Sequence, residues 1–181
     1  ALLNKQKVDR TILEKLKIKT NNPKLNDWKR VVKAKLLPER EVNVSFVGKY
    51  TELKDSYKSI NEALEHAGIK NKAQVNINFV EAENLTSKNI RKTLKNADAV
   101  LVPGGFGERG VEGMILACKF ARENNIPYLG ICLGMQLMCL NSDENKGSAG
   151  FGWFPVSVKE FSKKPGLRVP HLSLIHISEP T

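Results

Sequence analysis

The sequence predicts an α/β fold built around an open, parallel, doubly wound sheet. Between Glu41 and Ile131, apolar runs of strand length alternate with segments whose apolar residues recur at helical spacing. None of the short Asn-Gly or Asp-Gly turns typical of hairpins separates these runs. Because repeated strand–helix–strand units pair their strands in parallel through right-handed crossovers, helices are expected on both faces of one sheet.

The expected elements follow this alternation along the chain. Strands are predicted over 42–47, 74–80, 99–102 and 128–131, and helices over 57–67, 86–94, 111–123 and 135–138. Polar residues alternate with Val75, Ile77 and Phe79, so the second strand is expected to be a half-exposed sheet edge. The third and fourth strands are apolar nearly throughout and are expected to be buried on both faces. Core stripes are expected on two helices, at Tyr57, Ile60, Leu64 and Ala67 and at Met114, Ile115, Ala117, Cys118 and Ala121.

The first 40 residues differ from the rest in pattern and charge. Apolar residues at helical spacing predict a helix over 7–17, which Asn21-Asn22-Pro23 ends, and an amphipathic helix over 28–37, which Pro38 ends. The chain has a net charge of +10, and its first 50 residues hold 13 Lys or Arg against 5 Asp or Glu. No aromatic interleaving or nucleic-acid motif accompanies these lysines. A solvated linker surface is therefore expected, and no nucleic-acid partner.

The composition of the 181 residues is that of a globular domain with a flanking piece, at 41% hydrophobic and 27% charged residues. No apolar run approaches the ~20 residues of a membrane span, and no N-terminal signal segment is visible. Three cysteines at unrelated spacings argue against a disulfide framework, so a reducing, cytoplasmic location is expected. No metal-ligand spacing is visible, and no metal site is expected in this chain.

A cysteine between two glycines follows the last strand, in Gly130-Ile131-Cys132-Leu133-Gly134. A strand-to-helix turn of this composition is typical of a nucleophile elbow, here with sulfur in place of oxygen. The tight turn strains the central residue and needs small neighbours where chain segments approach closely. It displays the thiol at a helix N-terminus, where the dipole favours thiolate. Cys132 is therefore the candidate nucleophile.

A second loop, Pro103-Gly104-Gly105-Phe106-Gly107, follows the strand predicted over 99–102. Such a loop can offer bare backbone N–H groups. If its strand lies beside the strand that ends at Cys132, the N–H groups of Gly105 and Leu133 could converge near the sulfur. They would then form an oxyanion hole.

These two motifs carry a resemblance to a known family. PGGFGERGVEGM and ENNIPYLGICLGMQ resemble the class I glutamine amidotransferase domain of CTP synthases, and the similarity covers about residues 1–136. The resemblance implies a flavodoxin-like fold that hydrolyses glutamine through a cysteine thioester. The ammonia would pass to a synthetase domain that aminates ATP-activated UTP to CTP. The resemblance also assigns roles to residues of this sequence. Cys132 would be the nucleophile, and the oxyanion and glutamine-binding backbone would come from Gly104, Gly105, Leu133, Gly134, Met135 and Gln136.

Beyond Gln136 the resemblance changes. Residues 137–171 resemble the glutaminase subunit of imidazole glycerol phosphate synthase, and both families share GICLGMQ, as a chimeric join of two genes would produce. A divergent CTP synthase is the alternative. Residues 1–40 are expected to be the end of a synthetase domain and a linker helix, residues 41–171 a truncated amidotransferase domain, and residues 172–181 a non-native tail. Apolar surface is expected to stay uncovered around Phe151, Trp153, Phe154 and Val156.

The family's downstream His-Pro-Glu segment, which supplies the base for the cysteine, is absent from the sequence. The histidines are His66, expected on a solvated helix face, and His171 and His176, where the resemblance fails. The fragment is therefore expected to be inactive. Arg109 follows the glycine loop, and the resemblance implies either a lid or GTP-effector role for it; a surface arginine without a partner is the other interpretation.

For the whole family member the resemblance implies ATP, Mg²⁺ and the effector GTP as ligands, none of them bound by this fragment. It also implies glutamine and the synthetase domain as partners, no membrane, and a homo-oligomer. Three alternatives stay open: the imidazole glycerol phosphate synthase glutaminase, a cysteine hydrolase of the peptidase or deglycase kind, and a non-catalytic glutamine-binding remnant.

Overall fold

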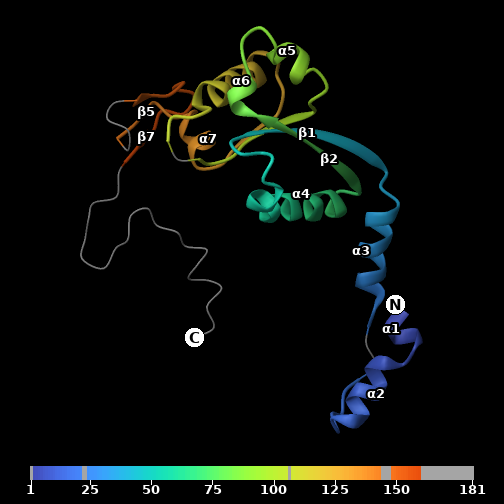
Figure 1. The fold of residues 1–181 in the computed structure, drawn as a ribbon. Coiled ribbons are helices and arrows are strands. Elements are labelled where there is room, and N and C mark those ends of the chain that lie inside the picture. The colour runs from blue at the N-terminus through green and yellow to red at the C-terminus, as the bar shows by residue number, and fades with distance from the viewer. Residues whose placement is uncertain (1, 22–23, 106, 144–147, 160–181) are drawn as a thin grey trace, which may run out of the picture.

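The computed structural model describes residues 2–21, 24–105, 107–143 and 148–159. Its main sheet has four parallel strands in the order β2-β1-β3-β4, which confirms the predicted parallel α/β architecture (Figure 1). The strands are β1 (Arg40–Gly48), β2 (Ala73–Glu81), β3 (Ala99–Val102) and β4 (Tyr128–Gly130). Since β1 lies between β2 and β3, the strand order reverses there. The crevice at such a reversal, beyond the carboxyl ends of the strands, is where ligands bind in open α/β sheets.

Helices cover both faces of this sheet, as predicted (Figure 1). On one face α4 (Lys58–Lys70), preceded by the short helix η1 (Lys54–Tyr57), packs on a core of Val44, Phe46 and Leu101. On the other face lie η2 (Ala82–Asn84), α5 (Ile90–Thr93) and α6 (Val111–Glu123), over a second core. The expected stripe of α6 is buried at Met114, Ala117, Cys118 and Ala121. In the stripe expected over 57–67, which lies on η1 and α4, Tyr57, Ile60 and Leu64 pack against the core, but Ala67 is exposed.

Strand β2 is a half-exposed edge, as its alternating sequence predicts, and β3 is buried. The prediction that the fourth strand is buried on both faces is wrong. Leu129 pairs in register with the buried Leu101 but is 52% exposed, and Ile131 is 39% exposed. The reason is that α4 packs over β1 and β2, and among the described residues no helix covers the same face beside β4.

The helix predicted over 86–94 is much shorter than expected. The side chain of Asn89 accepts a hydrogen bond from the Thr86 N–H (2.8 Å) and donates one to the Asn84 carbonyl (2.8 Å). These bonds fix a turn in place of a first helical turn, and α5 begins only at Ile90. The predicted helix 135–138 is also displaced, since α7 spans Leu133–Gln136.

Beyond α7 the described chain forms a small sheet in the order β6-β5-β7. Its strands are β5 (Asn141–Ser142), β6 (Ser148–Ala149) and β7 (Ser157–Val158). Phe154 and Val156 are exposed, as expected for this region. Phe151 and Trp153 are instead half-buried, because their rings stack at a centroid distance of 4.9 Å and the Arg122 guanidinium lies over Trp153.

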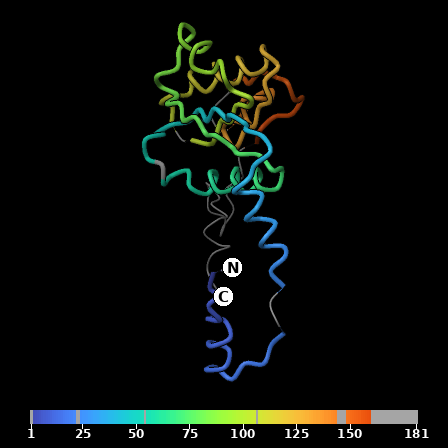
Figure 2. Tube along the Cα trace, turned by 90° about the vertical axis from the view of Figure 1, so that its right-hand side faces the viewer, coloured from blue at the N-terminus to red at the C-terminus, as the bar shows by residue number. Residues whose placement is uncertain are grey.

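The N-terminal segment extends away from the sheet as a helical arm (Figure 2). It contains α1 (Leu2–Lys5), α2 (Val8–Lys15) and α3 (Asn26–Leu36), and no residue of these helices is buried. Helix α3 approaches α4 through a Lys35–Glu65 ion pair. The two predicted N-terminal helices are thus confirmed, and the domain limits expected at residues 40 and 171 remain predictions.

Residues 172–181, His171 and His176 lie outside the described residues. In the part of the chain that the structure describes, no helix is both long and apolar enough to cross a lipid bilayer.

Candidate active site

Three segments meet at the carboxyl edge of the main sheet. Lys49 follows β1, the loop Pro103–Gly105 follows β3, and Cys132 follows β4. The strands are adjacent and parallel in the order β1-β3-β4, so their ends share one edge. This is the edge at which open α/β sheets bind ligands.

Cys132 sits in a strained turn between β4 and α7. Its backbone angles are φ 51° and ψ −111°, which a residue with a side chain adopts only when its surroundings enforce them. The Cys132 carbonyl accepts hydrogen bonds from the Met135 N–H (3.0 Å) and the Gln136 N–H (2.9 Å). The side chain is exposed and forms no disulfide. The predicted elbow geometry is therefore present, and a single turn of helix follows it.

Two glycines let the elbow pack this tightly. A methyl group on Gly134 would lie 2.1 Å from the Val102 carbonyl oxygen, so the start of α7 rests directly on the end of β3. A methyl group on Gly130 would lie 2.3 Å from the Gly134 carbonyl oxygen. That same oxygen accepts a hydrogen bond from the Tyr128 hydroxyl (2.8 Å). The elbow is thus held by contacts that only glycine permits.

The glycine loop and the cysteine are in direct contact. A methyl group on Gly104 would lie 2.9 Å from the Cys132 Cβ and 3.4 Å from its Sγ. Leu133 is the first residue of α7, so its N–H has no acceptor within the helix. The Gly105 N–H makes no backbone hydrogen bond to another described residue. The structure thus places the two segments side by side, and the convergence of their N–H groups into an oxyanion hole stays a prediction.

Among the other predicted binding residues, Met135 is exposed and Gln136 is half-buried on α7. Cys118 and Cys139 are buried, in contrast to Cys132. Burial raises the pKa of the Cys118 thiol and of the neighbouring Tyr128 hydroxyl, which keeps both groups protonated. His66 is exposed on α4, as predicted. Cys132 is therefore the accessible thiol of the three.

Arg109 has partners, so the interpretation of a surface arginine without one is wrong. Its Nε pairs with Glu83 Oε1, and its guanidinium lies 5.1 Å from the centre of the Tyr50 ring. Glu81 at the end of β2 accepts bonds from the N–H groups of Tyr50 (3.1 Å) and Thr51 (2.9 Å) and from the Thr51 hydroxyl (3.0 Å). The segment after β1 is thus tied to β2 and to the residues that follow the glycine loop.

Lys49 belongs to this edge and was not predicted from the sequence. It is 3% exposed, and its Nζ donates a hydrogen bond to the Gly107 carbonyl (2.6 Å). Burial lowers the pKa of this lysine below its usual range. A signal was available in the sequence, since Lys49 is a charged residue placed directly after the buried run Val44–Gly48.

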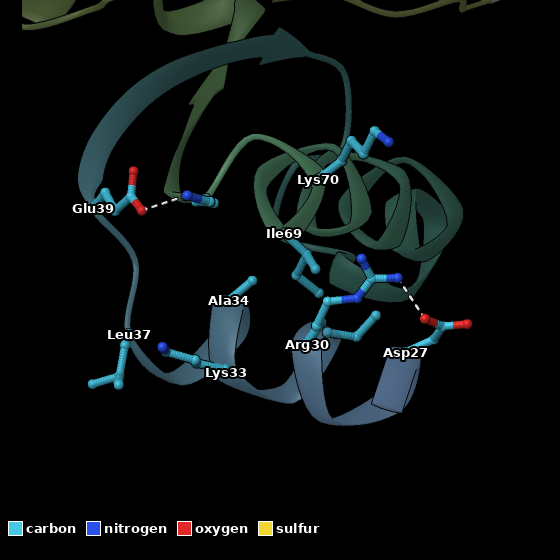
Figure 3. Close-up of a pocket in the computed structure, with 10 residues that line it drawn as sticks. Asp27, Arg30, Lys33, Ala34, Leu37, Glu39, Ile69 and Lys70 are labelled. Carbon is cyan, nitrogen blue, oxygen red and sulfur yellow. Dashed lines mark hydrogen bonds and ion pairs between the residues drawn. The ribbon is translucent and has the colours of Figure 1, made fainter. Parts of the chain in front are cut away.

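A cavity of about 510 Å³ lies elsewhere, between α3 and the end of α4 (Figure 3). Ala34, Leu37 and Ile69 line it together with charged side chains that include Arg30 and Lys70. It adjoins Glu39 and Lys72, which immediately precede β1 and β2, so it lies at the amino edge of the sheet. The cavity is therefore at the opposite edge of the sheet from Cys132. In the described residues, no group of three or more His, Cys, Asp or Glu side chains could hold a metal ion.

Comparison with known proteins agrees with this site. The model of the family "Glutamine amidotransferase class-I" matches residues 52–161. A similar solved structure is the glutaminase domain of CTPS from Trypanosoma brucei with bound acivicin, at 42% sequence identity and a TM-score of 0.51. The similarity covers 55% of this chain and 39% of that chain, so this chain spans well under half of that structure. Because the matched segment runs from the turn after β1 through the cysteine elbow to beyond β7, the chain belongs to the class-I glutamine amidotransferase family.

Proposed function

We propose that this chain carries the glutaminase part of a CTP synthase, in which Cys132 hydrolyses glutamine to supply ammonia for the amination of UTP. The observation that carries the proposal is the strained turn at Cys132 in contact with Gly104. The 42% identity to the Trypanosoma brucei CTPS glutaminase domain favours the CTP synthase branch over the imidazole glycerol phosphate synthase glutaminase. Membership of the amidotransferase family speaks against a peptidase or deglycase.

The chemistry proposed for the site has two half-reactions. In the first, the Cys132 sulfur attacks the side-chain carbonyl carbon of glutamine, and the N–H groups of Gly105 and Leu133 stabilise the negative oxygen. The intermediate collapses to a glutamyl thioester as the C–N bond breaks, and the thiol proton leaves with the nitrogen as ammonia. In the second, water attacks the thioester and releases glutamate and the free thiol. Gly134, Met135 and Gln136 would hold the rest of the glutamine.

Both half-reactions need a group that moves protons. The sequence contains His66, His171 and His176, and His66 is exposed on α4, whose last turn lies toward the amino edge of the sheet. None of these residues is assigned as the base. We therefore propose that the chain by itself turns glutamine over slowly, and that Cys132 still reacts with electrophiles that need no proton relay.

The remaining ligands are proposed for the whole protein. ATP and Mg²⁺ would bind the synthetase domain that the resemblance to CTP synthases implies. Residues 1–40 would be the end of that domain and the linker, and the whole protein would be a cytoplasmic homo-oligomer. GTP would act near Arg109, whose contacts with Glu83 and Tyr50 tie the loop after β3 to the segment after β1.

Protection by substrate tests this function. The chain is incubated with a diazo-ketone analogue of glutamine, and modification of the Cys132 peptide is followed by mass spectrometry. We expect glutamine to slow the labelling of Cys132 in a saturable way, and glutamate and asparagine to have little effect. Equal protection by all three amino acids, or none by glutamine, would contradict a glutamine site.

A further inference from the structure

Lys49 is an unusual residue to find at 3% exposure. Lysine is almost never buried unless its ammonium group is paired, because removing a charge from water is costly. Its surroundings disfavour the charged form, since burial lowers its pKa. A lysine buried at the carboxyl edge of the sheet therefore depends on hydrogen bonds to its neighbours, and one of them is to the loop after β3.

The side chain of Lys49 contacts the glycine loop at two points. Its Nζ donates to the Gly107 carbonyl at 2.6 Å. Its stem packs on Gly105, where a methyl group would lie 3.3 Å from the Lys49 Cδ and Cε and 3.7 Å from Nζ. The neighbouring residue, Gly104, makes the equivalent contact with Cys132. Two successive glycines thus pack against two different side chains, the lysine and the nucleophile.

The backbone of Lys49 is itself fixed. Its carbonyl accepts a hydrogen bond from the Tyr57 hydroxyl (2.6 Å), and that ring packs edge-on against Phe46 at a centroid distance of 4.6 Å. Immediately after it, Glu81 accepts bonds from Tyr50 and Thr51. A side chain anchored in this way can hold the loop at a defined position.

We propose that Lys49 is a positioning residue of the glutamine site: its stem and ammonium group hold the loop after β3 so that the Gly105 N–H faces the carbonyl that Cys132 attacks. The inference rests on the proposed function. Lys49 does not touch the reacting atoms itself. Its removal lets the loop relax, which weakens stabilisation of the negative oxygen more than it changes access to the thiol.

The test compares two reagents on the full chain. The diazo-ketone analogue of glutamine needs the binding backbone, whereas iodoacetamide needs only an accessible thiol. Lys49→Met keeps most of the stem and removes the ammonium group, and Lys119→Met, at an exposed lysine on α6, is the matched control. For each variant, the limiting rate and the half-saturating concentration of the analogue are measured at Cys132.

We expect Lys49→Met to lower the limiting rate of analogue labelling by up to about 100-fold, the order of magnitude that a displacement of about 1 Å can cost. Labelling by iodoacetamide should stay within about twofold, because exposure and thiolate character are kept. Lys119→Met should match the unmodified chain with both reagents. Lys49→Arg, which retains a charged donor, should label faster than Lys49→Met.

Unchanged analogue labelling in a folded Lys49→Met chain would overturn the inference, and so would an equal loss with both reagents. If Lys49→Met does not fold, Lys49→Gln is measured in its place, and failure of both to fold would make Lys49 a core residue and overturn the proposal. The proposed function fails separately, if the unmodified chain shows no saturable labelling by the analogue.

Discussion

Gly104 packs directly against Cys132, so closely that a methyl group there would lie 2.9 Å from the cysteine Cβ and 3.4 Å from its sulfur. The loop after β3 and the turn after β4 are therefore one structural unit, although Gly104 and Cys132 are 28 positions apart in the sequence. A nucleophile and the backbone beside it are held at fixed spacing by two adjacent parallel strands.

Replacing Gly104 tests this contact. In Gly104→Ala the new methyl group must push the loop or Cys132 aside, because its nearest neighbour is the Cβ of a strained residue. We expect labelling of Cys132 by the glutamine analogue to fall by about tenfold or more, while the free energy of unfolding drops by about 1–3 kcal/mol, as for other overpacked sites. Labelling that is unaffected in a folded variant would show that the contact is not needed.

Gly134→Ala tests the close packing of α7 against the end of β3. The methyl group would lie 2.1 Å from the Val102 carbonyl oxygen, and a backbone atom cannot rotate away. We expect a loss of about 3 kcal/mol in the free energy of unfolding, at the upper end of the usual overpacking cost. Gly107→Ala is the control, since a methyl group there meets nothing within 4 Å and only its φ of 77° is strained. Its expected cost is about 1–2 kcal/mol, and chemical denaturation measures both.

Stability should decrease at alkaline pH. Burial raises the pKa of Cys118 above 9.0 and that of Tyr128 above 10.0, so on raising the pH the unfolded chain loses these protons before the folded chain does. At these two sites the unfolded state then binds fewer protons than the folded state, so both make the free energy of unfolding fall as pH rises above about 9, whereas the lowered pKa of Lys49 acts in the opposite direction. Urea denaturation between pH 8 and pH 10.5 measures the slope. Tyr128→Phe should show a shallower decline above pH 10, and an identical decline would contradict the assignment.

Glutamine turnover by this chain should be slow. Removal of the histidine from a nucleophile–base pair costs up to about 10⁶-fold in rate in a well-studied serine enzyme. We therefore expect ammonia formation far below the ~10 s⁻¹ of an ordinary enzyme. A coupled ammonia assay, with Cys132→Ser as the background, measures it. Turnover within tenfold of that value would show that one of the three histidines has been recruited.

Much of this fold could be predicted because strand and helix patterns here are local. The strand Ala99–Val102 and the helix Val111–Glu123 begin and end where their apolar patterns do. The elbow at Cys132 was predictable because glycines mark its close approaches. The exposure of Leu129 on the fourth strand was not predictable, because the apolar sequence of a strand does not show whether a helix packs on each of its faces. Lys49 was missed because the apolar run before it was used only to place the strand, and not to ask whether the lysine that follows it is buried.

The central claim is that the fold, and not the intrinsic reactivity of a thiol, makes Cys132 a nucleophile for glutamine-like carbonyls. The direct measurement is the rate at which the diazo-ketone glutamine analogue modifies each of Cys118, Cys132 and Cys139, in native buffer and in denaturant, by mass spectrometry of the three peptides. The account predicts modification of Cys132 well ahead of the two buried cysteines in the folded chain, protection by glutamine, and loss of this preference on unfolding. Equal labelling of the three thiols in the folded chain, or a preference for Cys132 that survives denaturation, would contradict it.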